Sequence, residues 1–421
     1  MGKYGRKNQV NLDPLSYNIM ILGTPKVGKT TVTKEFCEKL AGEDGYLFFE
    51  FGQERGADAI EGINHVNIPL WYGGNLSDEE LERMELNNEA PFEDVLEDIF
   101  KYSDINEIID IIENKTTDYP DLRVVIWDTY DQFINVAEEE AIRLWNKECR
   151  ENGHPEKCAK TINGAWGGFG KGEKKAMELM TNVMAEMRKV GIATIILGHV
   201  KNKDVTDVVT GETYQTLTSD QQQNYFNHIK KNLHFLGLAY IDRTIVKEKT
   251  GKKNPVDKKE QTVNKVTAEA RKIKFRDDSY AVDSGSRFAD IVPEIDLNAD
   301  QLIEAIRGAI LCEQKKSGVS LADAKAAQEA KVAAEEAKIA EKASAVKNEK
   351  KLDEVKKEII DFFVANKSNI NAIKPILAKC KALGYENPKA NAQYIESGLI
   401  RLLSVSNAYE MGKTAAQIAM Q

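Results

Sequence analysis

The segment that most constrains the fold is a glycine-rich loop near the N-terminus. Residues 23–30 read Gly-Thr-Pro-Lys-Val-Gly-Lys-Thr and fill every fixed position of the phosphate-binding pattern G-x-x-x-x-G-K-[ST]. The run before it, Tyr17–Leu22, is short, apolar and β-prone, and Thr31–Leu40 has helical spacing of apolar residues. A strand, this loop and a helix in that order predict that the chain binds a nucleoside triphosphate.

Each part of this loop suits one part of a nucleotide. Gly23 and Gly28 let the backbone curl so that successive N–H groups point inward, and the helix start adds partial positive charge. Lys29 can reach the β- and γ-phosphates, and Thr30 is placed to hold Mg²⁺. The predicted nucleotide-binding residues are Gly23, Thr24, Pro25, Lys26, Val27, Gly28, Lys29, Thr30 and Thr31.

The 421 residues are enough for one large core and a smaller second unit. Residues 15–312 alternate short β-like runs with helix-periodic segments, which predicts an α/β core with a mostly parallel sheet. The expected strands are Tyr17–Leu22, Tyr46–Glu50, His65–Ile68, Arg123–Trp127, Ala193–Leu197 and Leu238–Val246, followed by Thr244–Lys249 and Val263–Phe275 around a turn at Thr250–Pro255, and a short hairpin ending at Tyr280–Asp283.

The segments outside this core differ in composition. Residues 1–14 form a polar, basic arm without the apolar core of a signal peptide. Residues 313–351 are rich in Ala, Lys and Glu, which predicts a solvent-exposed helical linker. Residues 352–421 regain apolar residues at helical spacing, which predicts a small helical module that could recruit a partner such as a single-strand-binding or replication protein.

The chain has no apolar stretch of about 18 residues, and its five cysteines are scattered. We therefore expect no membrane association, reduced thiols and a cytoplasmic location.

Charge is distributed unevenly along the chain. Residues 76–121 hold sixteen Asp and Glu residues against three Lys and Arg residues, whereas residues 243–276 hold twelve Lys and Arg residues against four acidic ones. Both runs could be solvated faces. Alternatively, the basic run meets phosphate or the acidic run of a neighbouring subunit.

Polar residues follow other predicted strands. Asp128 ends a hydrophobic strand, where open α/β sheets place ligand chemistry, and is predicted to bind Mg²⁺ together with Thr30. Hydrolysis needs a residue that positions water, and Glu50, Gln53 and Glu54 are the candidates; we favour Glu50. His199 follows another buried strand and could sense the γ-phosphate.

Two long loops are expected to leave the same sheet edge. The first, Arg150–Lys175, sets Trp166 and Phe169 among glycines and lysines, and the second, Lys201–Gln223, is rich in Thr and Gln. Cations beside mobile aromatic rings suit single-stranded nucleic acid, although the two rings could instead pack on the core. The predicted nucleic-acid-binding residues are Lys157, Lys160, Trp166, Phe169, Lys171, Lys201 and Lys203.

The order of these motifs resembles phage-encoded RecA-like ATPases, and within them the Sak-type single-strand annealing ATPases. The resemblance covers about Asn11–Ile295 and rests on the phosphate loop, Asp128-Thr129, residues 168–172, residues 198–201, and the run 271–276 leading into 283–288.

The resemblance implies a RecA-like P-loop fold, use of ATP with Mg²⁺, a homo-oligomer that is a ring or filament, and annealing or strand exchange on single-stranded DNA in phage recombination or replication. It implies that Lys29, Asp128 and His199 take catalytic positions. Cations from a neighbouring subunit would complete the site, and Lys272, Lys274 and Arg276 are the candidates. Relatives carry an acidic residue followed by Thr-Glu-Gly after the second strand, whereas residues 50–53 read Glu-Phe-Gly-Gln, which leaves the catalytic Glu displaced or missing and turnover slow.

Two other functions are compatible with these motifs. The first is a nucleotide-switched loader or scaffold whose C-terminal module brings a replication protein to DNA. The second is a small-molecule kinase, which ranks last because we find no Arg-rich lid segment.

Overall fold

The chain divides into two compact units, residues 1–329 and residues 330–421. The computed structural model describes residues 9–70, 77–99, 115, 117–207, 210–253, 260–276 and 282–334, and in the C-terminal part residues 337, 356–359, 361–362, 365, 374–375, 378 and 411–414. These C-terminal stretches are helical, with Ile359 and Met411 buried. Residues 321–334 are helical and largely exposed, and most of the predicted linker and module lies outside the described residues.

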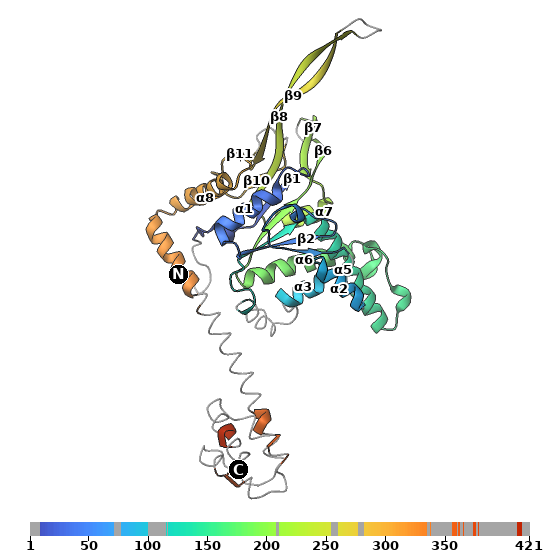
Figure 1. The fold of residues 1–421 in the computed structure, drawn as a ribbon, viewed down its shortest axis with the longest axis vertical. Coiled ribbons are helices and arrows are strands. Elements are labelled where there is room, and N and C mark those ends of the chain that lie inside the picture. The colour runs from blue at the N-terminus through green and yellow to red at the C-terminus, as the bar shows by residue number, and fades with distance from the viewer. Residues whose placement is uncertain are drawn as a thin grey trace. The chain divides into compact units, whose positions relative to one another are not determined.

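A nine-stranded sheet forms the centre of the first unit (Figure 1). From one edge to the other, its strands are β11 (Glu294–Asp296), β9 (Glu260–Lys274), β8 (Phe235–Lys253), β1 (Ile19–Gly23), β5 (Ala193–Gly198), β4 (Val124–Asp128), β2 (Tyr46–Phe51) and β3 (His65–Ile68), and β10 (Gly285–Ser286) pairs with β8. The strands from β8 to β3 are parallel to one another, and β9, β10 and β11 are antiparallel to their neighbours. The predicted mostly parallel α/β sheet is confirmed.

Helices cover both faces of this sheet, which is why β1 and β4 are buried along their whole length. On one face, α1 (Lys29–Ala41) and α8 (Ala299–Lys315) pack on Ile21, Ile126 and Ile195. On the other face, Trp127 and Phe51 contact Phe133 of α5 (Tyr130–Glu151). The remaining helices are α2 (Asp78–Leu86), α3 (Phe92–Ile99), α6 (Lys171–Lys189) and α7 (Gln223–Lys230), with 3-10 turns η1 (Pro14–Ser16), η2 (Ala57–Ala59), η3 (Pro155–Lys157) and η4 (Ile162–Gly167).

Strands β8 and β9 are longer than the sequence pattern predicts. They pair from Leu238 with Lys274 to Lys253 with Glu260, so the separately expected strands at 238–246 and 244–249 are one strand. Figure 1 shows this pair continuing beyond the rest of the sheet as a two-stranded arm. Residues 254–259 of the expected turn and residues 277–281 of the expected short hairpin lie outside the described residues.

The second expected loop is a hairpin rather than an irregular segment. Strands β6 (Val200–Thr206) and β7 (Thr213–Ser219) pair antiparallel along seven residues each. The expectation of a long loop is wrong because Val recurs along β6 and Thr along β7, and both residue types favour strands. Hairpin β6–β7 begins directly after the buried strand β5.

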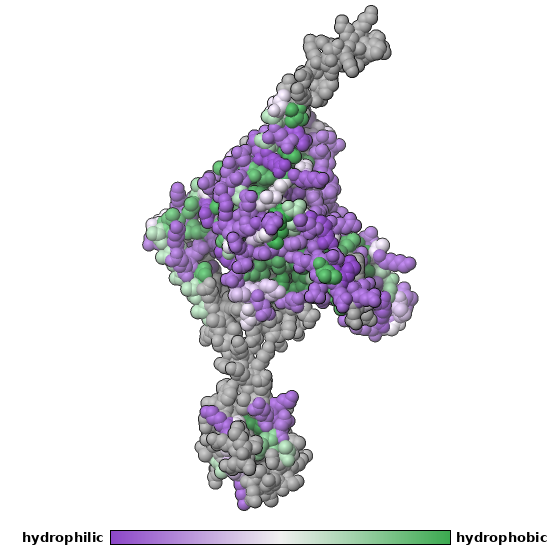
Figure 2. Space-filling model, in the orientation of Figure 1, coloured by the Kyte–Doolittle hydropathy of each residue, from purple (hydrophilic) through white to green (hydrophobic). Residues whose placement is uncertain are grey.

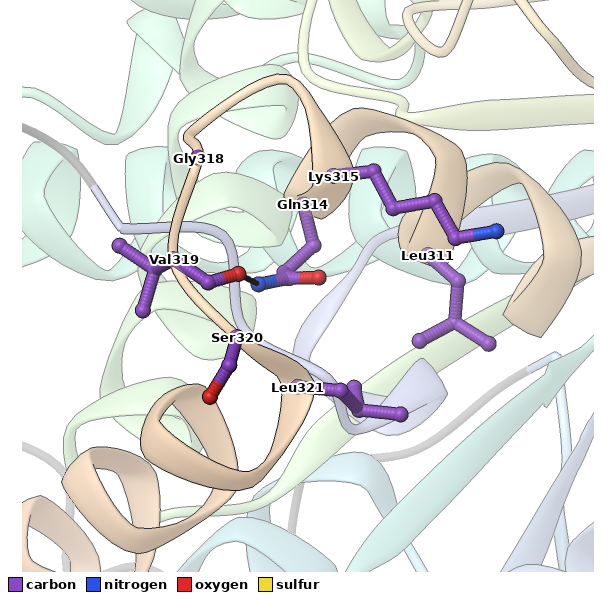
Figure 3. Close-up of a pocket in the computed structure, with 7 residues that line it drawn as sticks. All are labelled: Leu311, Gln314, Lys315, Gly318, Val319, Ser320 and Leu321. Carbon is purple, nitrogen blue, oxygen red and sulfur yellow. Dashed lines mark hydrogen bonds between the residues drawn. The ribbon is translucent and has the colours of Figure 1, made fainter.

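A sharp turn follows α8. Gly318 has φ +73°, and Gln314 Nε2 donates a 2.8 Å hydrogen bond to the carbonyl oxygen of Val319. The turn lies beside a cavity of about 560 Å³ between Leu311 and Leu321 (Figure 3).

Hydrophilic residues cover most of the described surface of the first unit on the face shown in Figure 2. Among the described residues, no helix has the length and apolar character needed to cross a lipid bilayer.

We expect α8 to be part of the core rather than an appendage. Ile306 is fully buried against the sheet, so Ile306→Ala should lower the free energy of unfolding by about 2–5 kcal/mol. Urea denaturation measures the free energy of unfolding. The control Arg307→Ala, at the next position, which is exposed, should alter this free energy by less than about 0.5 kcal/mol. Equal stability of both variants would show that α8 does not contribute to the core.

Candidate nucleotide-binding site

The phosphate loop joins β1 to α1 at the centre of the sheet. A Cβ on Gly23 would lie 2.9 Å from the carbonyl oxygen of Ala239 on β8, so only glycine allows this close approach. Gly28 has φ +105°, a left-handed conformation that also favours glycine, and Val27 is fully buried and anchors the loop. The loop therefore ends at the helix start, where free backbone N–H groups can bind an anion.

Lys29 is held at the mouth of this loop. Its side chain is nearly buried, and Nζ donates hydrogen bonds to the carbonyl oxygens of Gly23 at 3.1 Å and Thr24 at 3.3 Å. Burial lowers the pKa of Lys29, and the charges of Asp128, Asp131 and Glu54 act in the opposite direction. The ammonium group is thus positioned next to the loop and surrounded by carboxylates.

Thr30 and Asp128, the predicted magnesium ligands, lie in contact. Thr30 Oγ1 donates a 2.8 Å hydrogen bond to Asp128 Oδ2 at the end of β4. Burial raises the pKa of Asp128 to about 7, against the hydrogen bond from Thr30. A hydroxyl and a carboxylate oxygen beside a phosphate loop are the oxygen donors that Mg²⁺ prefers, so these two residues fit the ion.

The two candidate carboxylates, Glu50 near the end of β2 and Glu54 after it, differ in their partners. Glu50 is almost fully buried, accepts a 2.6 Å hydrogen bond from the Ala57 backbone N–H, and lies 3.0 Å from His65 Nδ1. Burial raises its pKa. Glu54 is only partly buried; its Oε1 accepts a 3.4 Å hydrogen bond from Thr129 and lies 3.9 Å from His199 Nδ1. Glu54 therefore faces the group around Lys29, whereas Glu50 is bound to its own loop.

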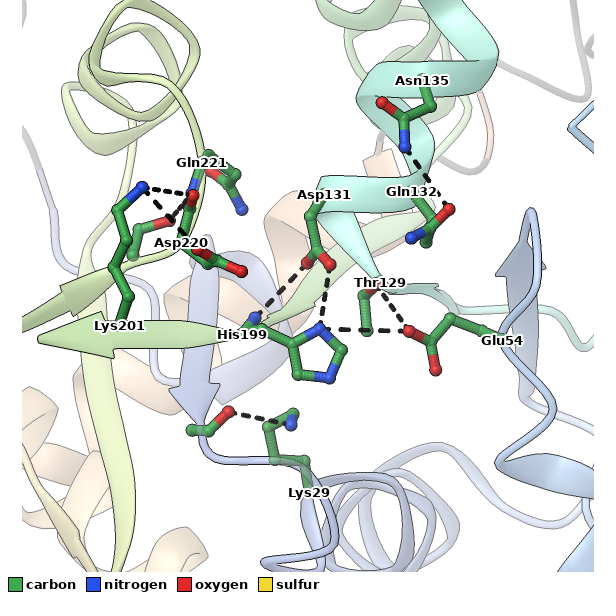
Figure 4. A network of polar contacts seen from close by, with 12 residues as sticks. Lys29, Glu54, Thr129, Asp131, Gln132, Asn135, His199, Lys201, Asp220 and Gln221 are labelled. Carbon is green, nitrogen blue, oxygen red and sulfur yellow. Dashed lines mark hydrogen bonds and ion pairs between the residues drawn. The ribbon is translucent and has the colours of Figure 1, made fainter.

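His199 connects the nucleotide site to hairpin β6–β7 (Figure 4). Its Nδ1 lies 2.9 Å from Asp131 Oδ2, and its backbone N–H donates to Asp131 Oδ1 at 3.3 Å. The hydrogen bond to Asp131 raises the pKa of His199, and the same bond lowers the pKa of Asp131 against the effect of burial. The carbonyl oxygen of His199 accepts a 3.0 Å hydrogen bond from the backbone N–H of Asp220, which follows β7 at the base of the hairpin.

Asp131 is absent from the residues that the sequence predicted for this site. The available signal is its position three residues after Asp128, in the first turn of α5. Asp131, Glu54 and His199 offer one ligand atom each within 4.8 Å of one another.

Arg271 is a second residue that sequence reasoning missed. Its Nη1 atom lies 3.3 Å from the position that a Cβ on Gly28 would occupy, so a cation from β9 stands beside the phosphate loop of the same chain. The neighbouring candidates have other contacts within this chain: Lys272 pairs with Asp242 at 3.0 Å and Glu294 at 3.1 Å. Lys274 Nζ lies 5.7 Å from the Tyr240 ring centre, and Arg276 Nη2 donates to the carbonyl oxygen of Ala289 at 2.6 Å.

The predicted nucleic-acid-binding residues occupy two places. In the first loop, Trp166 Nε1 donates a 2.9 Å hydrogen bond to the carbonyl oxygen of Ala141, which holds the ring against α5. Phe169 is fully exposed with φ +55°. Lys157, Lys160 and Lys171 of this loop are exposed, as are Lys201 and Lys203 on β6.

The raised pKa of Asp128 makes a testable contribution to stability. A carboxyl group with a pKa raised from 3.8 to about 7 favours folding below pH 4, and this contribution is lost as the pH rises through 7. In nucleotide-free protein with EDTA at pH 8, Asp128→Asn should therefore be more stable than wild type by roughly 2–4 kcal/mol. Urea denaturation should show this gain shrinking towards pH 4.

The matched control is Asp44→Asn at an exposed turn, which should change stability by less than about 0.5 kcal/mol at either pH. A gain for Asp128→Asn that is equal at pH 4 and pH 8 would contradict the pKa assignment.

The chain was compared with known proteins. No curated protein matches it. Among solved structures it is similar to a KaiC-like protein from the hyperthermophilic archaeon Pyrococcus horikoshii, with 12% identity, a TM-score of 0.25, and coverage of 61% of this chain and 78% of that chain. The model of the AAA domain family matches residues 15–274, more than half of the 421 residues, and this span contains the phosphate loop, Asp128 and His199. The chain therefore belongs to the AAA domain family and contains a P-loop ATPase domain.

Proposed function

We propose that this protein is a Mg²⁺-dependent ATPase that binds single-stranded DNA and promotes annealing or strand exchange. The observation that carries the proposal is the chain of interactions that runs from Lys29, on which the charge of Asp131 acts, through Asp131 and His199 to Asp220. His199 links the two parts, because its ring contacts Asp131 at the nucleotide site and its backbone carbonyl closes hairpin β6–β7. A change at the γ-phosphate would thereby reach a hairpin that carries exposed lysines.

The roles in ATP hydrolysis follow from the side-chain positions. Lys29 and the N–H groups of the loop bind the phosphates, and Thr30 and Asp128 hold Mg²⁺, which when bound neutralises charge on the phosphates. We assign the water-positioning role to Glu54 rather than to Glu50, because Glu54 faces His199 and Thr129. Glu50 instead orders residues 50–57 through its bonds to Ala57 and His65.

This assignment predicts a difference between two conservative variants. Glu54→Gln should lower kcat for ATP hydrolysis by about 10²–10⁴ and leave Mg·ATP affinity within about threefold, because only proton transfer is lost. Glu50→Gln keeps an oxygen that accepts from Ala57 and should retain kcat within about tenfold. A steady-state phosphate-release assay with a fluorescent-nucleotide titration separates these results, and the reverse order would return the role to Glu50.

Single-stranded DNA is proposed to contact the exposed residues around η4 and hairpin β6–β7. Phe169 offers a ring that is fully exposed, and Lys157, Lys160 and Lys171 supply charge beside it. On the hairpin, Lys201 Nζ donates to the carbonyl oxygen of Asp220 at 2.7 Å and Lys203 Nζ to Gln223 Oε1 at 2.8 Å. Both amino groups are exposed and have further donors for phosphate. Trp166 contributes by supporting this loop, since its N–H is bonded to α5.

If the Phe169 ring stacks on a DNA base, removing the ring should weaken DNA binding. Phe169→Ala should weaken binding to a fluorescent oligothymidine by about 1–3 kcal/mol in anisotropy titrations, with unchanged Mg·ATP affinity. Leu86→Ala removes another strongly exposed apolar side chain, on α2, and should leave DNA affinity unchanged. Equal affinities of the two variants would exclude Phe169 from the DNA contact.

Self-assembly is proposed to complete the nucleotide site. Lys272, Lys274 and Arg276 lie on and after β9 and could face a neighbouring subunit's nucleotide, but Lys272 would first exchange its partners Asp242 and Glu294. The resemblance to Sak-type phage ATPases supports this ring or filament and a role in phage recombination or replication.

The alternative is a nucleotide-switched loader. A separate compact unit, residues 330–421, supports this alternative because such a unit could bind a partner protein. In that case the second unit recruits a single-strand-binding or replication protein, and hydrolysis is slow or incidental.

One experiment tests the main proposal against this alternative. Full-length protein should bind oligothymidine more tightly, by at least tenfold, with Mg·ATP than without nucleotide, and added salt should weaken this binding. Lys29→Ala should lose both nucleotide binding and the ATP-dependent gain, whereas Lys39→Ala, an exposed lysine later in α1, should retain both. Binding to DNA that ignores ATP, or that needs an added replication protein, would favour the loader.

A further inference from the structure

A second polar cavity lies at the opposite edge of the sheet from the phosphate loop. It has a volume of about 450 Å³ and is lined by residues at the N-terminal ends of β1, β5 and β8, by the end of α6, and by Arg287 after β10. Parallel strands carry the phosphate loop and Asp128 at their C-terminal ends, so this cavity is separate from the nucleotide site.

The lining of this cavity is positively charged. Arg188, Lys189 and Arg287 line it together with neutral residues, and none of its lining residues is Asp or Glu. Lys189 pairs with Glu186 at 2.5 Å. Within the part of the chain that the structure describes, no ion pair forms at either Arg188 or Arg287.

Both guanidinium groups are fixed by neutral acceptors. Arg188 Nη2 donates to Asn18 Oδ1, and Arg287 Nε donates to the carbonyl oxygen of Leu233 at 2.9 Å. Asn18 Nδ2 in turn donates to the carbonyl oxygen of Asn232 at 2.7 Å. These bonds orient two cations without neutralising either, and a guanidinium has five N–H donors, so donors are left for a ligand.

His234 lies within the field of both arginines. Its pKa is lowered by burial first and then by the charges of Arg287 and Arg188. Its Nδ1 accepts a 3.1 Å hydrogen bond from the Asn18 backbone N–H, which leaves the proton of the neutral ring on Nε2 as one more donor. Arg188 and Arg287 are exposed to solvent, so an anion can reach both guanidinium groups.

We propose that this cavity is a second ligand site, which binds a phosphate monoester between Arg188 and Arg287. Two guanidinium groups that form no ion pair among the described residues match the nearly two negative charges of a phosphate monoester better than the single charge of a carboxylate. Met184, Ile196 and Ile229 give the cavity an apolar part, and its volume suits a ligand of nucleotide size. A nucleoside monophosphate and inorganic phosphate share this chemistry, and the test separates them.

The test is isothermal titration of the full-length chain with AMP, inorganic phosphate and adenosine, in the Lys29→Ala background so that the phosphate loop does not contribute. AMP should bind with 1:1 stoichiometry and adenosine should not. Tighter binding of AMP than of phosphate would identify a nucleotide-type ligand, whereas equal binding would identify free phosphate. No saturable binding of AMP or phosphate, or adenosine binding as tight as AMP binding, would overturn the proposal.

Variants then place the ligand. Arg188→Gln and Arg287→Gln should each weaken AMP binding at least tenfold, and Arg150→Gln, an exposed arginine on α5, should not. Asn18→Asp keeps an oxygen acceptor for Arg188 and adds the missing negative charge, so it should abolish AMP binding while urea denaturation shows a folded protein. Unchanged AMP affinity in Asn18→Asp and both arginine variants would overturn the assignment. Because the readout does not use ATP or DNA, it is independent of the proposed function.

Discussion

The hydrogen bond from Thr30 to Asp128 joins two segments that are 98 residues apart in the chain, and the nucleotide site depends on it. The bond is possible because β1 and β4 are parallel and are separated only by β5, so both strands end at the same edge of the sheet. The register between β2 and β4 also sets Glu50 beside Asp128. Strand order, rather than any local motif, therefore determines which polar residues meet.

Burying charged side chains at the sheet edge where β1 and β4 end is the main energetic cost of the nucleotide site. Lys29 is nearly buried, and Asp128, Asp131 and Glu54 all act on its charge. These groups balance one another only partly, since burial still lowers the pKa of Lys29 and raises that of Asp128. Bound phosphates would bring negative charge to Lys29, and a bound magnesium ion would bring positive charge to Asp128. The site is therefore arranged for binding a ligand rather than for the stability of the nucleotide-free protein. The aromatic cluster of Trp127, Phe133 and Phe51 directly below the edge keeps the strands in place.

The sequence predicted the parallel sheet and the phosphate loop well, because both leave strong local signals. Buried strands such as Val124–Asp128 are continuous apolar runs, and residues 23–30 fill a fixed pattern. Side-chain direction was not predictable. Glu50 and Glu54 lie in one short segment, and only the structure shows that Glu50 bonds to Ala57 and His65 whereas Glu54 faces His199. Arg271 could not be predicted either, because it approaches Gly28 through strand pairing across more than 240 residues.

Hairpin β6–β7 meets the nucleotide site at one residue, His199. The first residue of the hairpin, Val200, follows His199 directly. The second strand ends beside His199, where the backbone N–H of Asp220 donates to the His199 carbonyl oxygen. The backbone of His199 therefore bonds to Asp131 through its N–H and to Asp220 through its carbonyl oxygen. Lys201, the second residue of β6, is bonded to Asp220 as well, so its amino group moves with the same unit. In the function proposed above, coupling would need no long pathway, because His199 belongs both to the nucleotide site and to the base of the hairpin.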